Sequence, residues 1–222
     1  LKATFAEAVQ NYKNKNFKNT ELICFKILSI DPNHIDSLTL LATISARNRN
    51  FDKAKELMLK VVEIQPKNLS GLNNLGIAYK ELGQVKEAIN IYKKILEIDP
   101  NHANGNYNLG SAFYSLREFK TAKRYLQKTV EIQNNYALAF FSLGNVHVDL
   151  KEFKEALSCY QKVIELNPNF VSAHNNLGLL YRDLNDFQNA INCYQKAIKI
   201  QPDYPNAHHN LGILYKELGE FE

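Results

Sequence analysis

The sequence predicts an all-α fold in which antiparallel helix pairs repeat and stack into a solenoid. Three observations support this: a fixed period of 34 residues, apolar residues at helical spacing within each period, and a proline near the end of most periods. Self-similarity at a period of this size is typical of repeat proteins. The residues that mark the period are Gly76, Gly110, Gly144, Gly178 and Gly212, preceded in the same position by Ala42 and Ala8.

The period divides the chain into six complete repeats and one partial repeat. We expect a single repeat array over residues 1–222, without a linker. The chain begins without a methionine and stops within a repeat, so we expect it to be a fragment of a longer protein. The complete repeats are 1–34, 35–68, 69–102, 103–136, 137–170 and 171–204, and the partial repeat is 205–222.

Each repeat is predicted to contain two helices. In the third repeat, Leu72, Leu75 and Tyr79 form a one-sided apolar stripe, and a second stripe begins after Gly83. Pro100 ends the second helix, because proline cannot continue a helix. Since the connections are short, neighbouring helices should be antiparallel.

The turn between the two helices has its own pattern. We expect the residue after the first helix to adopt the left-handed conformation, which Gly83, Asn185 and Gly219 tolerate well. The other repeats place a basic residue there, at some strain: Lys15, Arg49, Arg117 and Lys151. Two residues later an aromatic residue recurs, which we expect to fill the space between the helices: Phe17, Phe51, Phe119, Phe153, Phe187 and Phe221, with Val85 as the exception.

The recurring glycine lies in the middle of a predicted helix, where it costs about 1 kcal/mol relative to alanine. We therefore expect that the partner helix passes close to it. The sequence suggests that small residues of the second helix face it at this crossing: Ala54, Ala88, Ala122, Ala156 and Ala190.

These positions resemble the tetratricopeptide repeat, whose consensus is W-x2-L-G-x2-Y, then A-x3-F, then P. The third repeat matches it with Leu72 in the Trp position, Leu75-Gly76, Tyr79, Ala88, Tyr92 and Pro100. The resemblance covers the whole chain, although the first repeat lacks Leu-Gly and the fourth has Asn134 in place of the proline. It implies a right-handed superhelix in which the first helix of each pair lines a concave groove.

A row of amide side chains is predicted on the groove face of the first helices. An amide carries both donors and an acceptor, so a regular row can pair with the backbone of an extended peptide. The row resembles the asparagine ladder in the tetratricopeptide arm of O-linked N-acetylglucosamine transferases. Alternatively, these amides only satisfy neighbouring helices. The row consists of Asn74, Asn108, Asn176 and Asn210, with Ser142 in the remaining position.

Other side chains are expected beside this row. Tyr107 and Tyr114 are candidate aromatic anchors for a partner, or else pack between repeats. Asn145, Lys80 and Arg182 complete the candidate peptide-binding groove.

Composition excludes several functions. A net charge of +4, from 27 basic and 23 acidic residues, does not indicate a dedicated nucleic-acid binder. No apolar run is long enough to span a membrane. Three cysteines without metal-binding spacing favour free thiols and a cytoplasmic location. We expect no cofactor, no metal site and no catalytic residues; His174 and His208, one period apart, fall in the core Trp position.

The sequence therefore predicts a non-catalytic scaffold that binds an extended peptide or a partner protein in its groove. Two alternatives stay open. The chain could be the substrate-recruiting arm of a larger enzyme of the glycosyltransferase or sulfotransferase type. It could also self-assemble into a homo-oligomer through its open repeat ends.

Overall fold

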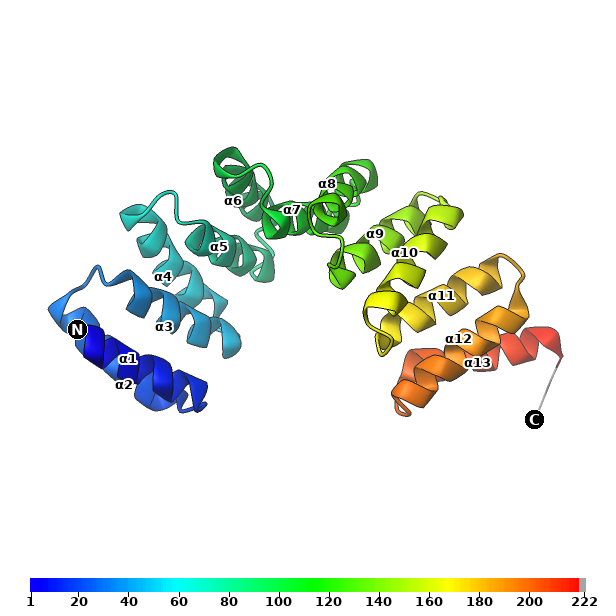
Figure 1. Cartoon of the computed structure of the whole chain (residues 1–222), viewed down its shortest axis with the longest axis horizontal. Helices are drawn as coiled ribbons and strands as arrows, with labels where there is room; N and C mark the ends of the chain where they lie inside the picture. The colour runs from blue at the N-terminus through cyan, green and yellow to red at the C-terminus, as the bar shows by residue number, and fades with distance from the viewer. Residues whose placement is uncertain (220–222) are drawn as a thin grey trace. The chain divides into compact units, whose positions relative to one another are not determined.

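The computed structural model describes residues 1–219, and within that range the chain forms thirteen α-helices and no strand (Figure 1). The first and second helices alternate with the predicted period. They are α1 (Lys2–Lys13), α2 (Phe17–Ile30), α3 (Ile35–Arg47), α4 (Phe51–Ile64), α5 (Leu69–Glu81), α6 (Val85–Ile98), α7 (Ala103–Ser115), α8 (Phe119–Ile132), α9 (Ala137–Asp149), α10 (Phe153–Leu166), α11 (Val171–Asp183), α12 (Phe187–Ile200) and α13 (Pro205–Leu218).

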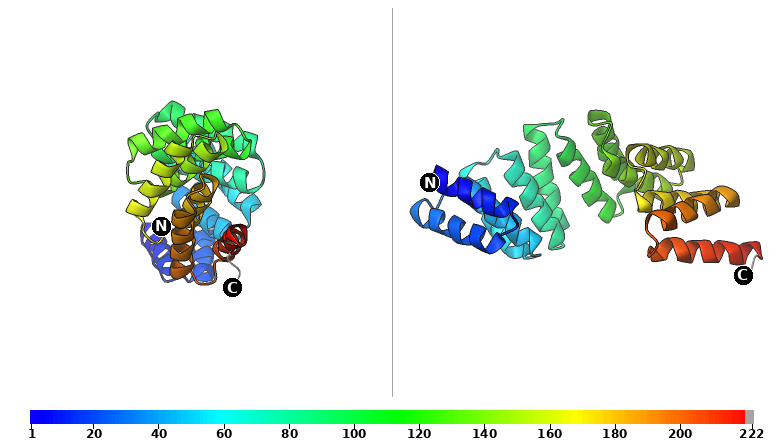
Figure 2. Two further views of the ribbon diagram at one scale, coloured as in Figure 1. Left: turned by 90° about the vertical axis from the view of Figure 1, so that its right-hand side faces the viewer. Right: turned by 60° about the horizontal axis from the view of Figure 1, so that its bottom comes forward.

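The chain divides into two compact units, Leu1–Ala112 and the part that begins at Phe113, with the boundary inside α7. In unit 1, helices pair as α1–α2, α3–α4 and α5–α6, and each pair packs on the next through α2–α3 and α4–α5. In unit 2, α9–α10 and α11–α12 pair, and α12 also packs on α13, as the orange and red helices of Figure 2 show. The predicted helix pairs are confirmed, while one continuous array over 1–222 stays a prediction.

The predicted left-handed turn is present in every repeat. At each non-glycine position, the left-handed conformation of an L residue costs roughly 1–2 kcal/mol. The backbone φ angles are 61° at Lys15, 58° at Arg49, 61° at Arg117, 60° at Lys151, 60° at Asn185 and 74° at both Gly83 and Gly219.

The recurring phenylalanine is the first residue of the second helix. It packs against the preceding helix but stays half-buried, so it closes the gap between the helices only in part. The ring of Phe17 lies 5.5 Å from that of Tyr12, and the ring of Phe119 lies 5.7 Å from that of Tyr114. Phe221 lies outside the described residues.

At Gly76, Gly144 and Gly178 the recurring glycine makes room for a tyrosine ring, so the expectation that an alanine is its nearest neighbour is wrong there. A Cβ atom on Gly144 would lie 2.7 Å from the ring of Tyr160, and one on Gly178 would lie 2.6 Å from the ring of Tyr194. Both rings are buried. Where a smaller side chain, Met58, holds the tyrosine position, the glycine position carries an alanine. Glycine and tyrosine are therefore a packing pair.

A polar residue in the Trp position hydrogen-bonds the carbonyl of the proline six residues earlier. His174 Nε2 donates to Pro168 O at 2.9 Å, and His208 Nε2 donates to Pro202 O at 2.8 Å. Asn106 Nδ2 donates to the equivalent Pro100 carbonyl at 3.2 Å. These side chains fix the end of the preceding helix, which explains the two histidines structurally.

Candidate functional site

The amide row forms hydrogen bonds between successive repeats. Asn108 Nδ2 on α7 donates to Asn73 Oδ1 on α5 at 2.8 Å. In unit 2, Asn210 Nδ2 on α13 makes the same bond to Asn175 Oδ1 on α11 at 2.9 Å. The pairing asparagine lies just before the row position of the preceding repeat, so the sequence pair Asn-Asn links two repeats.

Asn176 makes a different bond because Phe141 holds the pairing position in the repeat before it. The Phe141 ring lies against Phe170, with centroids 5.0 Å apart. Asn176 Nδ2 instead donates to Asn145 Oδ1, one helical turn further along α9, at 3.0 Å. That oxygen also accepts a hydrogen bond from Tyr160 Oη at 2.8 Å.

The amide row therefore already contributes to the hydrogen bonds that join successive repeats. Since Asn175 Nδ2 donates to Asn176 Oδ1 at 3.3 Å, the amides of unit 2 form a continuous chain from α13 to α10. Each row amide uses one Nδ2 hydrogen on its neighbour and keeps a second. Asn74 differs: it is half-buried and makes no side-chain hydrogen bond to the described part of the chain.

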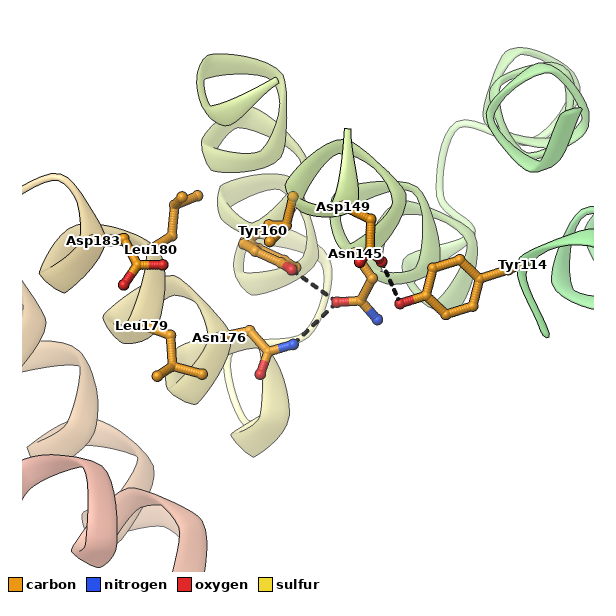
Figure 3. A pocket seen from close by; sticks show the side chains of 9 residues that line it. Tyr114, Asn145, Asp149, Tyr160, Asn176, Leu179, Leu180 and Asp183 are labelled. Atoms are coloured by element: carbon orange, nitrogen blue, oxygen red, sulfur yellow. Dashed lines mark hydrogen bonds between the residues drawn. The ribbon is translucent and has the colours of Figure 1, made fainter. Parts of the chain in front are cut away.

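A pocket of about 380 Å³ opens beside the amide row in unit 2 (Figure 3). Its walls come from α7, α9, α10 and α11, so consecutive repeats build it. Three of the residues predicted for the groove, Tyr114, Asn145 and Asn176, lie in it together. The full lining is Tyr114, Asn145, Val148, Asp149, Tyr160, Asn176, Leu179, Leu180 and Asp183.

The polar groups of this pocket are carboxylates, phenols and amides. Tyr114 Oη donates to Asp149 Oδ2 at 2.8 Å. Burial, followed by the hydrogen bond to Asp149, raises the pKa of Tyr114 to about 12. Burial also raises the pKa of Tyr160. Both phenols are therefore protonated near neutral pH and act as hydrogen-bond donors.

A smaller pocket of about 180 Å³ occupies the corresponding position three repeats earlier, in unit 1. Asn74 lies there where Asn176 lies in unit 2, and Met58 replaces Tyr160. Thr43 replaces Asn145, so this lining contains one amide, Asn74, in place of two. The lining is Ala42, Thr43, Ala46, Phe51, Ala54, Met58, Asn74, Ile77 and Ala78.

The remaining predicted groove residues do not line either pocket. Tyr107, Ser142, Lys80 and Arg182 are half-buried on first helices. Arg182 lies with its Nη2 atom 3.7 Å from Asp183 Oδ1. Whether these residues contact a partner stays a prediction.

Sequence reasoning missed the two aspartates of the pocket, because acidic residues near a helix end usually lie in solvent. A signal was present nonetheless. Acidic residues recur at one position of the repeat, at the end of the first helix: Glu81, Asp149, Asp183 and Glu217.

A second cluster of titratable groups is structural. Glu152 accepts hydrogen bonds from Lys123 Nζ at 2.7 Å and from His147 Nδ1 at 2.6 Å. These bonds, with that from Lys123 the stronger cause, lower the pKa of Glu152. His147 is 8% exposed, as expected for a residue in a core position. The cluster ties α8 to α9 and to the turn after it.

Residues 1–219 contain no group of three or more potential metal ligands within reach of one ion. The same residues include no helix that is long and apolar enough to cross a membrane.

Sequence models of known families match most of the chain. A model described as TPR repeat matches residues 78–116, 144–181 and 178–219, which is more than half of the sequence. A tetratricopeptide repeat model matches residues 103–136. The chain belongs to the tetratricopeptide-repeat family. A model of subunit 3 of the anaphase-promoting complex, or cyclosome, also matches residues 13–95.

Solved tetratricopeptide structures are similar to this chain. MamA is 29% identical, with a TM-score of 0.66 over 72% of this chain and 94% of MamA. YrrB, described as a TPR protein with an unusual peptide-binding site, is 26% identical, with a TM-score of 0.65 over 84% of this chain and 96% of YrrB. A comparison with curated protein sequences gave no match.

The hetero-tetramer Cut9–Hcn1 of the anaphase-promoting complex shares the fold. Its identity is 16% and its TM-score is 0.82, over 95% of this chain and 42% of the matched chain. The family, together with MamA and YrrB, supports a scaffold of the protein-interaction type.

Proposed function

We propose that the chain is a non-catalytic tetratricopeptide scaffold that binds an extended segment of a partner protein. The segment lies along the amide-row face of the first helices. The observation that carries this proposal is the pocket of unit 2, which opens beside Asn176 and has walls from consecutive repeats. A pocket of this size falls in the usual range for ligand sites, and here it adjoins a row of backbone-compatible amides.

The amides retain capacity for a peptide backbone. Asn176 and Asn210 each spend one Nδ2 hydrogen on a neighbouring repeat and keep the other. Asn145 uses only its oxygen among the described residues, so both hydrogens of its Nδ2 group are available. Each bond to a peptide contributes on the order of 0.5–1.5 kcal/mol, so affinity must come from several repeats.

The relatives support the same kind of partner. YrrB is described as having a peptide-binding site, and Cut9 is solved in an assembly with Hcn1. The first is similar in sequence over most of this chain, and the second supports the fold alone.

Site-specific photo-crosslinking tests the proposal. A benzophenone amino acid replaces Leu179 in the pocket wall, and a control chain carries it at Lys162 on the second helix α10, whose side chain is 42% exposed. After irradiation in a lysate of the source cells, mass spectrometry maps the cross-linked segments. We expect short partner segments from position 179 in clear excess over position 162. Equal cross-linking from both positions would rule the pocket out as a binding site.

A further inference from the structure

We propose that the pocket of unit 2 receives a lysine or arginine side chain of the bound segment. This inference rests on the proposed function, since it names the chemistry that the same site selects. Two aspartates lie in the pocket lining, and none of its described lining residues is basic. Figure 3 shows Asp149 and Asp183 on opposite sides of the pocket, with Leu179, Asn176 and Tyr160 between them.

Each aspartate keeps an oxygen for an incoming donor. Asp149 Oδ2 accepts from Tyr114, while Asp149 Oδ1 has no partner in the described part of the chain. Asp183 Oδ1 lies 3.7 Å from Arg182 Nη2, a long contact on a side chain that is 52% exposed, and Asp183 Oδ2 is open. The pocket therefore offers two carboxylate oxygens to a cation.

The apolar walls suit the stem of such a side chain. Leu179, Leu180 and Val148 line the same space as the aspartates. Lysine and arginine carry an apolar stem below a charged head, and they commonly place the stem against apolar surface while the head reaches polar groups. One long basic side chain can therefore satisfy both kinds of lining at once.

An anionic side chain fits poorly. The pocket presents two carboxyl groups to it, and the two phenolic hydrogens are already committed, Tyr114 to Asp149 and Tyr160 to Asn145. Arg182 lies outside the lining, with its Nη2 atom 3.7 Å from Asp183 Oδ1. Arg117, which contributes to the electrostatics of Tyr114, also lies outside the lining.

The matching pocket of unit 1 provides an internal comparison. Three repeats earlier, Arg47 holds the position of Asp149, and Glu81 holds that of Asp183 but does not line the pocket. Its lining is apolar apart from Thr43 and Asn74. The same fold position thus carries two chemistries, and only the one in unit 2 suits a cation.

Selection from a random-peptide display library tests the inference. The baits are the wild-type chain, Asp149→Asn/Asp183→Asn, and a control with the same change in charge, Glu81→Gln/Glu87→Gln in unit 1. We expect the wild type and the control to enrich a lysine or arginine at one fixed position of the bound peptides. The pocket variant should lose that preference and bind an enriched peptide at least tenfold more weakly, because charge-assisted hydrogen bonds are lost.

Each other outcome has a distinct meaning. Enriched peptides without a basic residue would overturn this inference and leave the proposed function standing. A basic preference that persists in Asp149→Asn/Asp183→Asn would also overturn it, because the cation would then bind elsewhere. Failure of every folded bait to enrich any peptide would contradict the proposed function itself.

Discussion

Replacing Gly178 by alanine tests the glycine–tyrosine packing pair, which occurs in three of the repeats. The new Cβ atom would lie 2.6 Å from the ring of Tyr194, a contact that real Cβ atoms essentially never make. Tyr194 is fully buried, so its ring cannot swing away into solvent. Either the ring leaves its preferred rotamer or α11 and α12 move apart.

Two opposing effects determine how much Gly178→Ala changes the free energy of unfolding. Alanine gains about 1 kcal/mol over glycine in a helix interior. Overpacking a core by one methyl group costs roughly 1–3 kcal/mol. Gly212 supplies the control, because a Cβ atom there meets nothing within 4 Å. Gly212→Ala should therefore gain up to about 1 kcal/mol, and Gly178→Ala should be roughly 1–3 kcal/mol less stable than it.

A second-site change isolates the contact. The chain itself contains the alternative pair Ala42 and Met58 in these positions. Tyr194→Met should lower stability in the wild-type background, but its cost should be smaller in Gly178→Ala, because the clash disappears. Denaturation midpoints by circular dichroism, with amide hydrogen exchange in α11 and α12, measure all four variants. A Gly178→Ala chain as stable as Gly212→Ala would refute the reasoning.

Three other substitutions test the left-handed turn, the amide row and the Glu152 cluster. Lys151→Gly should raise the denaturation midpoint, because it relieves roughly 1–2 kcal/mol of left-handed strain and costs only about 0.5–1 kcal/mol of chain entropy. Lys154→Gly, inside α10, should lower the midpoint, and a lower midpoint for both variants would contradict the prediction. Asn145→Ala should cost about 1–3 kcal/mol, because two hydrogen bonds are lost and a buried phenol is left unpaired, whereas Asn74→Ala should change stability little; denaturant titration of both variants decides. The pKa of Glu152 is lowered in the folded chain, so its stabilisation is complete above the ordinary glutamate pKa of about 4.3 and is lost as the pH falls through the lowered value. The midpoint difference between wild type and Glu152→Gln should therefore shrink on acidification, and a difference that is constant with pH would refute the assignment.

The fold was predictable from the sequence because the repeat presents each local signal several times. A single arginine after a helix, such as Arg49, would not indicate a left-handed residue. Glycine and asparagine in the same position of other repeats reveal the required conformation, and the structure confirms it. The left-handed turn could therefore be predicted from several equivalent positions, although no single position indicates it strongly.

The partner of each recurring residue could not be predicted in the same way. The period fixes which residues are equivalent, but not how far the second helix is offset along its axis relative to the first. Ala190 and Tyr194 lie one turn apart on the same face of α12, so this offset decides which of them meets Gly178, and the tyrosine ring lies there. A matched change was a partial clue: glycine occurs with tyrosine in three repeats and alanine occurs with methionine at Ala42 and Met58, although Gly110 occurs with Leu126.

The candidate site was predictable only in part for the same reason. The row position of Asn176 followed from the period, but its bond to Asn145 depends on Phe141 filling the usual pairing position. Asp149 and Asp183 lie at helix ends, where acidic residues usually face solvent. Only the packing of both α9 and α11 against α10 brings them into one lining.

The most direct test of the central claim observes the amide row during binding. A peptide enriched by display is titrated into the ¹⁵N-labelled chain, and the side-chain NH₂ signals of Asn145 and Asn176 are followed by NMR. They are assigned from the spectra of Asn145→Ala and Asn176→Ala. We predict that both signals shift and saturate together with the binding curve. Shifts confined to the second helices α8, α10 and α12, with both amide signals unmoved, would contradict the account.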